Sequence, residues 1–291
     1  MRGARGVAPF AIAAALLVSP AFVRRAGAQQ ESAAAAMPEP PGQPSTSSQI
    51  VVQGRAATSP AWTQTRTFAA TRFWLLDPGR QAIETWWTSR RRKDGNAGET
   101  EHLFQLEYMV GATRGFELDV YFNYQHDAAQ GYHVEGAQLE ARVAPWRYGE
   151  VFLNPTLYLE WHPRNRDANR GEARLLLGGE VVPRLRGVLN PFVEQNLDSP
   201  GSGAPFAPDR ELGMTGALSY AVIERHLMVG GETRLVADQQ GGDRYQRVAK
   251  VGPAMWASFD EGHVFVTTSL LFGLTSHSDA FNPIVVLGIM P

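Results

Sequence analysis

The stretch Glu101–Gln125, EHLFQLEYMVGATRGFELDVYFNYQ, alternates apolar and polar side chains on both sides of a short turn that contains glycine. The apolar side chains occupy every second position: Phe104, Leu106, Tyr108 and Val110 before the turn, and Phe116, Leu118, Val120 and Phe122 after it. Alternation with a period of two over about nine residues is typical of a strand with one apolar and one polar face. The stretch therefore predicts a β-hairpin.

The same pattern recurs to the end of the chain and predicts twelve strands. Their approximate ranges are 81–90, 101–111, 116–125, 131–143, 150–162, 171–183, 187–197, 210–222, 225–237, 246–258, 263–275 and 281–290. The connections alternate between longer polar segments, such as RRKDGNAGET, and mostly shorter ones, such as ATRG. Short turns at one rim and longer loops at the other are typical of an outer-membrane barrel. No long helical pattern separates the strands, which argues against βαβ units.

Two architectures fit alternating strands. A soluble sandwich would bury the apolar faces in its own core. A membrane barrel turns them toward lipid and satisfies every backbone N–H and C=O by closing the sheet. Charged residues on the opposite face of nearly every strand, the number of strands and the alternating connections favour the barrel. The predicted fold class is all-β: a twelve-stranded antiparallel transmembrane β-barrel with a disordered N-terminal leader.

The first 28 residues have the features of a signal peptide for export through the Sec pathway. Arg2 and Arg5 precede an apolar run over residues 7–23, and Ala26-Gly27-Ala28 is an A-x-A cleavage site. Pro9 and Pro20 interrupt the run, so an uncleaved membrane anchor is the less favoured alternative.

The rest of the chain divides into three parts. Residues 29–64 are rich in Ala, Pro, Ser and Gln and are expected to form a flexible periplasmic leader. Residues 65–80 form a lead-in segment, which either plugs the periplasmic mouth or adds a strand. Residues 81–291 form the outer-membrane β-barrel.

Composition excludes several function classes. Loss of the four arginines in residues 1–28 would reduce the 27 Lys and Arg residues to 23 against 29 Asp and Glu, a formal charge of −6. No basic excess is available for a nucleic-acid backbone, so nucleic acid is not expected as a partner. The chain has no cysteine, which excludes disulfides, thiolate metal sites and a cysteine nucleophile.

Charged residues on the inward face of the predicted strands are the candidate functional residues. Nine are acids: Glu84, Glu107, Glu117, Asp119, Glu140, Glu160, Glu180, Glu194 and Glu232. Four are bases: Arg142, Arg174, Arg234 and Lys250. Ion pairing between the two sets would close and stiffen the lumen. Because the acids outnumber the bases, an acid-lined passage that prefers cations or polar solutes is the alternative.

No catalytic, cofactor or metal site is expected. Ser269 and His162 lie on inward faces of different strands, but no nucleophile, base and orienting group are placed together. No pair of histidines has metal-ligand spacing. The basic run Arg90–Lys93 falls in the first long loop, where it either contacts lipopolysaccharide phosphates or is simply solvated.

The segment ETWWTSRRRKDGNAGETEHLFQLEYMVGATRGFELDVYFNY, residues 84–124, resembles uncharacterised Gram-negative outer-membrane barrels that are transporter-like. These carry an aromatic first strand, an F-x-L-E-x-x-x-G strand, a tight turn and an E-L-x-x-Y strand. The resemblance extends loosely over residues 81–290 and implies no known substrate. The chain departs from the usual aromatic C-terminal residue, because it ends Gly288-Ile289-Met290-Pro291.

The sequence thus predicts a barrel in the cell outer membrane, in contact with outer-membrane lipids. Its leading function is a passive or weakly selective channel for small polar or cationic solutes. The alternative is a non-conducting structural or surface-interaction barrel. A lipid-modifying outer-membrane enzyme is the least favoured of the three.

Overall fold

Twelve antiparallel strands form a closed barrel in the computed structural model, which describes residues 59–93, 99–128, 131–165, 167–198, 209–239 and 245–291. The strands are β1 Gln81–Arg91, β2 Thr100–Thr113, β3 Phe116–Asp127, β4 Gly131–Val143, β5 Thr156–His162, β6 Arg170–Val182, β7 Leu185–Asn196, β8 Arg210–Ile223, β9 Leu227–Gln239, β10 Tyr245–Phe259, β11 Val264–Gly273 and β12 Phe281–Ile289. The predicted all-β class, the closed antiparallel barrel and the strand number are confirmed.

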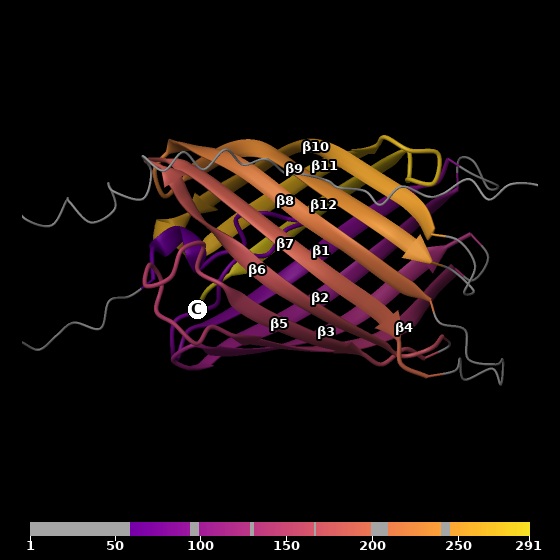
Figure 1. The fold of residues 1–291 in the computed structure, drawn as a ribbon, viewed down its shortest axis with the longest axis horizontal. Helices are drawn as coiled ribbons and strands as arrows, with labels where there is room; N and C mark the ends of the chain where they lie inside the picture. The colour runs from indigo at the N-terminus through magenta and orange to yellow at the C-terminus, as the bar shows by residue number, and fades with distance from the viewer. Residues whose placement is uncertain (1–58, 94–98, 129–130, 166, 199–208, 240–244) are drawn as a thin grey trace, which may run out of the picture. The chain divides into compact units, whose positions relative to one another are not determined.

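The sheet closes because β1 pairs with β12 as well as with β2. Ile83 lies opposite Ile289 at one end of this seam, and Arg91 lies opposite Phe281 at the other. Each remaining strand pairs with its neighbours in sequence, and Figure 1 shows the strands running obliquely around the barrel. Closure gives every strand a hydrogen-bonded neighbour on both sides, as a spanning sheet requires.

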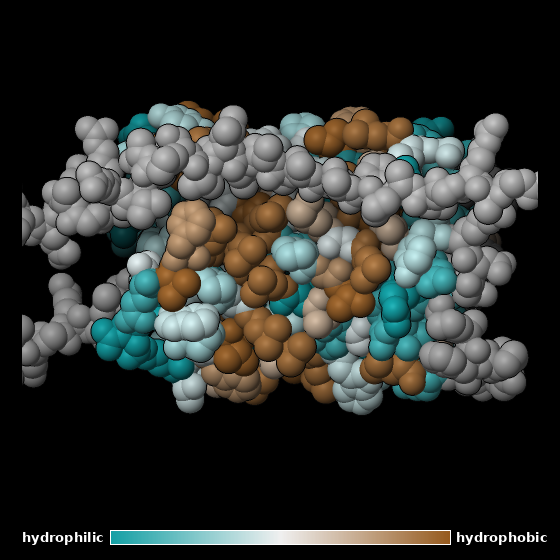
Figure 2. Space-filling model, in the orientation of Figure 1, coloured by the Kyte–Doolittle hydropathy of each residue, from teal (hydrophilic) through white to brown (hydrophobic). Residues whose placement is uncertain are grey.

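The outer wall is apolar, as the alternation predicts. Leu106, Phe122 and Leu287 point outward and expose 49%, 57% and 56% of their surface. Figure 2 shows hydrophobic side chains gathered over the middle of the wall and hydrophilic ones toward its two ends. An exposed apolar surface of this extent is unusual in soluble proteins and marks a surface that another apolar phase covers. The wall therefore has the surface of a membrane-spanning barrel.

One strand is shorter than predicted. β5 begins at Thr156 instead of residue 150, because residues 144–155 form a turn. Leu153 and Asn154 adopt left-handed backbone conformations with φ of 62° and 46°. The turn is held to the neighbouring strand, since the Leu153 carbonyl accepts from the Gly178 N–H and the Asn154 side chain donates to the Gly178 carbonyl. The apolar residues of this turn resemble an alternating strand, which explains the wrong boundary.

The segment before β1 lies inside the barrel and forms no strand, so of the two alternatives for residues 65–80 the additional strand is wrong. Residues 59–80 contain one short 3-10 helix, η1 Ala61–Thr63. Trp62 and Gln64 are buried, so packed structure begins earlier than the leader boundary expected at residue 64. The signal peptide and most of the expected leader fall outside the described residues. Among the residues that the structure describes, no helix is long and apolar enough to cross a membrane.

Candidate functional site: a plugged lumen lined by carboxylates

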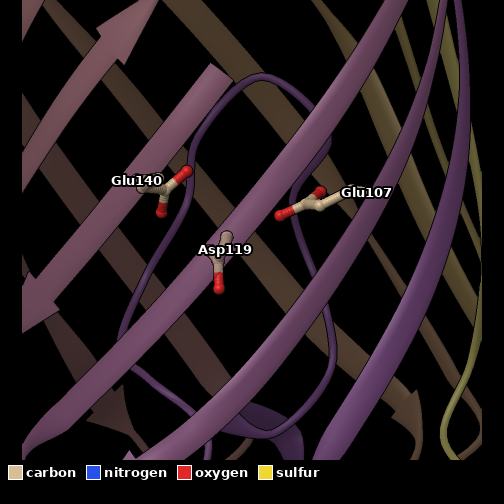
Figure 3. Close-up of side chains that lie close together, drawn as sticks. All are labelled: Glu107, Asp119 and Glu140. Carbon is tan, nitrogen blue, oxygen red and sulfur yellow. The ribbon is translucent and has the colours of Figure 1, made fainter. Parts of the chain in front are cut away.

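Residues 59–80, here called the plug, fold back on themselves within the lumen. The side chain of Gln64 connects the two arms, because its amide donates to the Leu75 carbonyl at 3.4 Å and its oxygen accepts from the Asp77 N–H at 2.8 Å. Figure 3 shows the plug as an arch inside the strands. These bonds replace the ladder that a strand would supply, so the plug has its own internal support.

An aromatic cluster fixes the base of the plug. Trp62 stacks on Phe73 with ring centroids 5.3 Å apart, and Trp74 meets Tyr148 edge to face at 5.3 Å. Tyr148 belongs to the 144–155 turn, and burial raises its pKa to about 12, so the phenol stays neutral. Aromatic pairs of this geometry stabilise packing beyond the area that they bury. The turn that shortens β5 therefore also holds the plug.

The tip of the plug is held by polar groups of distant strands. The Glu232 carboxylate on β9 accepts from the N–H groups of Ala69 and Ala70 at 2.8 and 2.6 Å. On β7, the Asn190 amide donates to the Arg72 carbonyl at 2.5 Å. Buried backbone groups need such partners, because an unsatisfied donor or acceptor is costly. The wall thus supplies the hydrogen bonds that the plug's backbone cannot make internally.

Two arginines of the plug provide counter-charges for the acids of the first three strands. Arg66 bonds to Glu84 through Nε at 2.5 Å and to both oxygens of Glu107 through Nη2 at 3.1 and 2.9 Å. Arg72 bonds to Glu117 at 2.9 Å and approaches Glu107 at 3.4 Å. The sequence predicts more inward acids than bases, and these plug arginines supply part of the missing charge. They lie outside the strand repeat, so strand periodicity did not identify them.

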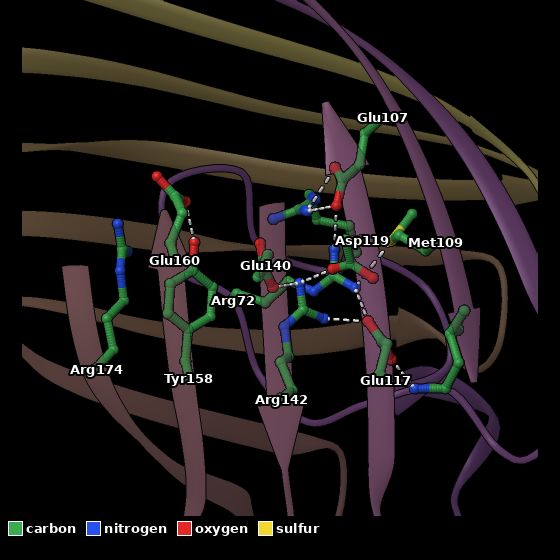
Figure 4. A network of polar contacts seen from close by, with 12 residues as sticks. Arg72, Glu107, Met109, Glu117, Asp119, Glu140, Arg142, Tyr158, Glu160 and Arg174 are labelled. Carbon is green, nitrogen blue, oxygen red and sulfur yellow. Dashed lines mark hydrogen bonds and ion pairs between the residues drawn. The ribbon is translucent and has the colours of Figure 1, made fainter. Parts of the chain in front are cut away.

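A third arginine, which belongs to the wall itself, neutralises acidic side chains of β3 and β4. Arg142 on β4 bonds to Glu117 at 2.5 Å and Asp119 at 2.6 Å, and it contacts Glu140. All four side chains are buried, and Figure 4 shows them converging with Arg72 in one network. Charge-assisted bonds of this kind offset the high cost of removing ions from water. This part of the lumen is a packed ionic core.

Acidic residues occupy directly opposed positions on seven consecutive strands. The acid band consists of Asp119, Glu140, Glu160, Glu172, Glu194, Glu211 and Asp238, each paired in register with the next from β3 to β9. Opposed residues share one face and lie next to each other. The band therefore runs across the inner wall from the ionic core to the ends of β8 and β9, at the rim that carries the long loops. Glu172, Glu211 and Asp238 were absent from the predicted set.

Basic residues of the wall pair with those acids of the band that lie toward this rim. The pairs are Arg174 with Glu172, Arg170 with Glu194 at 2.7 Å and Arg234 with Glu211 at 2.9 Å. Glu172 is buried, but the other five side chains are partly exposed, unlike those of the ionic core. A cavity of about 50 Å³ lies at the rim, lined by Arg170, Glu194, Gln195, Asp209, Arg210, Glu211 and Asp238. The outer half of the lumen is thus more accessible than the half that the plug fills.

The structure places the predicted site residues in three environments. Six are buried around the plug: Glu84, Glu107, Glu117, Asp119, Glu140 and Arg142, with Glu232 at the plug tip. Five lie farther toward the long loops: Glu160, Arg174, Glu194, Arg234 and Lys250, of which Lys250 bonds to Asn282 at 3.1 Å. Glu180 is the exception, because it is exposed at a strand end and accepts from the Arg184 N–H of the following turn. A register shift after Glu180 accompanies this placement.

The carboxylates of Glu107, Asp119 and Glu140 approach within 4.8 Å of one another, as metal ligands do (Figure 3). Arg66 bonds to Glu107, and Arg142 bonds to Asp119 and contacts Glu140. Guanidinium groups therefore offset the charge of these three acids, and the donor set does not call for a metal ion.

Neither candidate for nucleophilic catalysis has the surroundings that the chemistry needs. The buried Ser269 hydroxyl has no hydrogen-bond partner among the described residues. His162 lies 3.2 Å from the amide of Asn123 and 3.9 Å from Glu135. A serine nucleophile requires a base within hydrogen-bond reach. These two residues do not form such a pair.

Comparison with known proteins identifies the fold. No protein-family model matches the chain, and no curated protein matches it. Among solved structures, the COG4313 outer membrane channel from Pseudomonas putida F1 has a TM-score of 0.53 and 13% identity, over 75% of this chain and 98% of that one. The NanC porin has a TM-score of 0.48 and 11% identity, over 72% and 98%. At this identity, the first likeness shows that the chain has the fold of an outer-membrane channel.

Proposed function

We propose that the protein is an outer-membrane β-barrel that serves as a passive, weakly selective channel for small polar and cationic solutes. The acid band carries this proposal, because it crosses the lumen wall from the long-loop rim to the ionic core. Carboxylate-lined passages favour cations over anions. A twelve-stranded barrel is also wider than the eight-stranded type that side chains fill completely, which leaves room for a path.

The plug limits this path. It occupies the half of the lumen near the short turns, where its arginines bind Glu84, Glu107 and Glu117. Conduction through the intact protein is therefore expected to be small, with larger openings when the plug moves. Export by a Sec signal in residues 1–28 and contact with outer-membrane lipids belong to the same proposal, supported by the A-x-A site and the apolar wall.

Conductance in planar lipid bilayers tests the proposal. The folded full-length protein should give openings whose reversal potential in a KCl gradient shows a preference for K⁺ over Cl⁻. Glu160→Gln should reduce this preference, because Glu160 bonds to Gln138 and Tyr158 and forms no ion pair among the described residues. Glu261→Gln is the control, since Glu261 is exposed in the turn between β10 and β11. An absence of openings at high protein concentration, both from the wild type and from variants that loosen the plug, would reject the channel.

A closed structural barrel is the second candidate. It is favoured by the ionic core, in which Arg142 and its three acids are excluded from solvent. This function predicts no current from the wild type, and also none from variants that loosen the plug. Conduction by the wild type or by such a variant would support the channel instead.

A further inference from the structure

Glu84 and Glu107 form an unusual pair in the lumen wall. They lie directly opposite each other on β1 and β2, and both are buried. Like charges at opposed positions destabilise a sheet unless a cation lies between them. Among the described residues, their ion pairs are to Arg66 and Arg72, and both arginines belong to the plug. The wall therefore presents a dicarboxylate whose cation comes from outside the sheet.

Trp86 completes the surroundings of this dicarboxylate. The guanidinium carbon of Arg66 lies 4.0 Å from the centroid of the Trp86 ring. The indole N–H donates to Glu107 at 2.9 Å and so fixes that carboxylate. A planar cation thus stacks on an aromatic face while its N–H groups reach two carboxylates. This combination selects guanidinium over compact cations, because only a planar fork satisfies both features.

We propose that Glu84, Glu107 and Trp86 form a binding pocket for guanidinium-bearing solutes, and that Arg66 occupies it as a tethered competitor. The inference rests on the proposed channel function and specifies its solute class. The acid band leads to this pocket, since carboxylate oxygens of Asp119 and Glu140 lie within 4.8 Å of one of Glu107. A cation that enters at the long-loop rim therefore follows carboxylates up to the pocket.

Arg66 is suited to exchange because the plug is not part of the sheet. Its backbone is held by individual polar contacts, including those of Glu232 and Asn190, and not by a strand ladder. A tethered group competes at an effective concentration of about millimolar or more. A free solute therefore displaces Arg66 only at a comparable concentration, while removal of the Arg66 side chain should open the pocket to lower concentrations.

The test uses full-length Arg66→Ala in planar bilayers, with methylguanidinium as the probe. Occupation of the vacated pocket should block the K⁺ current at concentrations that leave the wild type unchanged. Tetramethylammonium at equal concentration should not block. Adding Trp86→Leu to Arg66→Ala should weaken the block about tenfold, which is the loss of one desolvated cation–π contact. Arg80→Ala is the matched control, because Arg80 is an exposed arginine of the same plug.

A second measurement keeps the pocket testable without current. Methylguanidinium should raise the unfolding temperature of detergent-solubilised Arg66→Ala more than equimolar KCl does. If the alanine variant does not fold, the same measurement is made on Arg66→Lys. Current without preferential block by methylguanidinium overturns the pocket and leaves the channel standing. Absence of current from every variant overturns the channel, and equal thermal shifts with methylguanidinium and KCl overturn the pocket.

Discussion

Arg142 shows at the scale of a residue why the charge count of the sequence was incomplete. The alternation placed Glu117, Asp119 and Glu140 on the inner face with Arg142. It did not show that one guanidinium contacts all three, because that depends on the register of β3 against β4. Side-chain direction follows from a period of two, whereas the choice of partner requires the strand offset.

Replacing Arg142 by Gln should strongly destabilise the barrel. Three buried carboxylates would lose their cation, and breaking a buried ion pair costs about 3–5 kcal/mol. Urea unfolding in lipid vesicles measures the loss. Arg147→Gln is the control, because Arg147 pairs with Glu150 at an exposed turn, where an ion pair contributes about 0–1 kcal/mol. Equal unfolding midpoints for the two variants would contradict the structural role of Arg142.

At the scale of elements, the strands were predictable and the plug was not. Eleven strand ranges were predicted to within a few residues, because each has a long alternating pattern between turn residues. The plug contains the apolar run Phe73–Leu76, which the sequence alone allowed as either a strand or a packed segment. Its place inside the barrel depends on contacts with strands that lie more than a hundred residues away, such as that of Glu232 with Ala69.

The backbone of the plug lies directly against the barrel wall at Gly111 on β2. A Cβ at this position would lie 2.3 Å from the Asp77 carbonyl oxygen, closer than any real contact. Gly111→Ala should therefore displace the arm of the plug that leads into β1 and raise single-channel conductance. Gly216→Ala is the control, because its Cβ would meet ordinary contacts at 3.4 Å and beyond. Unchanged conductance in Gly111→Ala, with the heat-modifiable gel mobility of a folded barrel, would show that the plug does not restrict the path.

At the scale of the whole molecule, the acid band depends on all the registers from β3 to β9 together. The sequence shows that each strand carries inward acids, but a shift of one strand by two residues would break the band without changing any face. The band is thus a property of the closed sheet. Glu211 and Asp238, which are paired at the outer end of the band, were not predicted. They lie at strand ends, where sequence patterns assign faces least reliably.

The plug also sets the charge of the whole lumen. Replacing Arg66 and Arg72 together by Gln removes two positive charges that contact Glu84, Glu107 and Glu117. The K⁺ over Cl⁻ permeability ratio should rise, together with conductance. Reversal potentials in a salt gradient measure the change, and Arg80→Gln controls for loss of an exposed arginine. A permeability ratio equal to that of the wild type would mean that the acids do not face the conducting path.

The position of the plug in the chain has a consequence for the order of folding. The bonds from the Arg66 and Arg72 side chains to Glu84, Glu107 and Glu117 span 18 to 45 residues. The bond from the Ala69 N–H to Glu232 spans 163 residues, and that from the Thr267 hydroxyl to the Arg66 carbonyl spans 201. Short loops close with less loss of chain entropy and form earlier. The plug can therefore associate with the first hairpin while the later strands are still unpaired. The sheet then curls around a segment that is already in place, and the seam between β1 and β12 closes last.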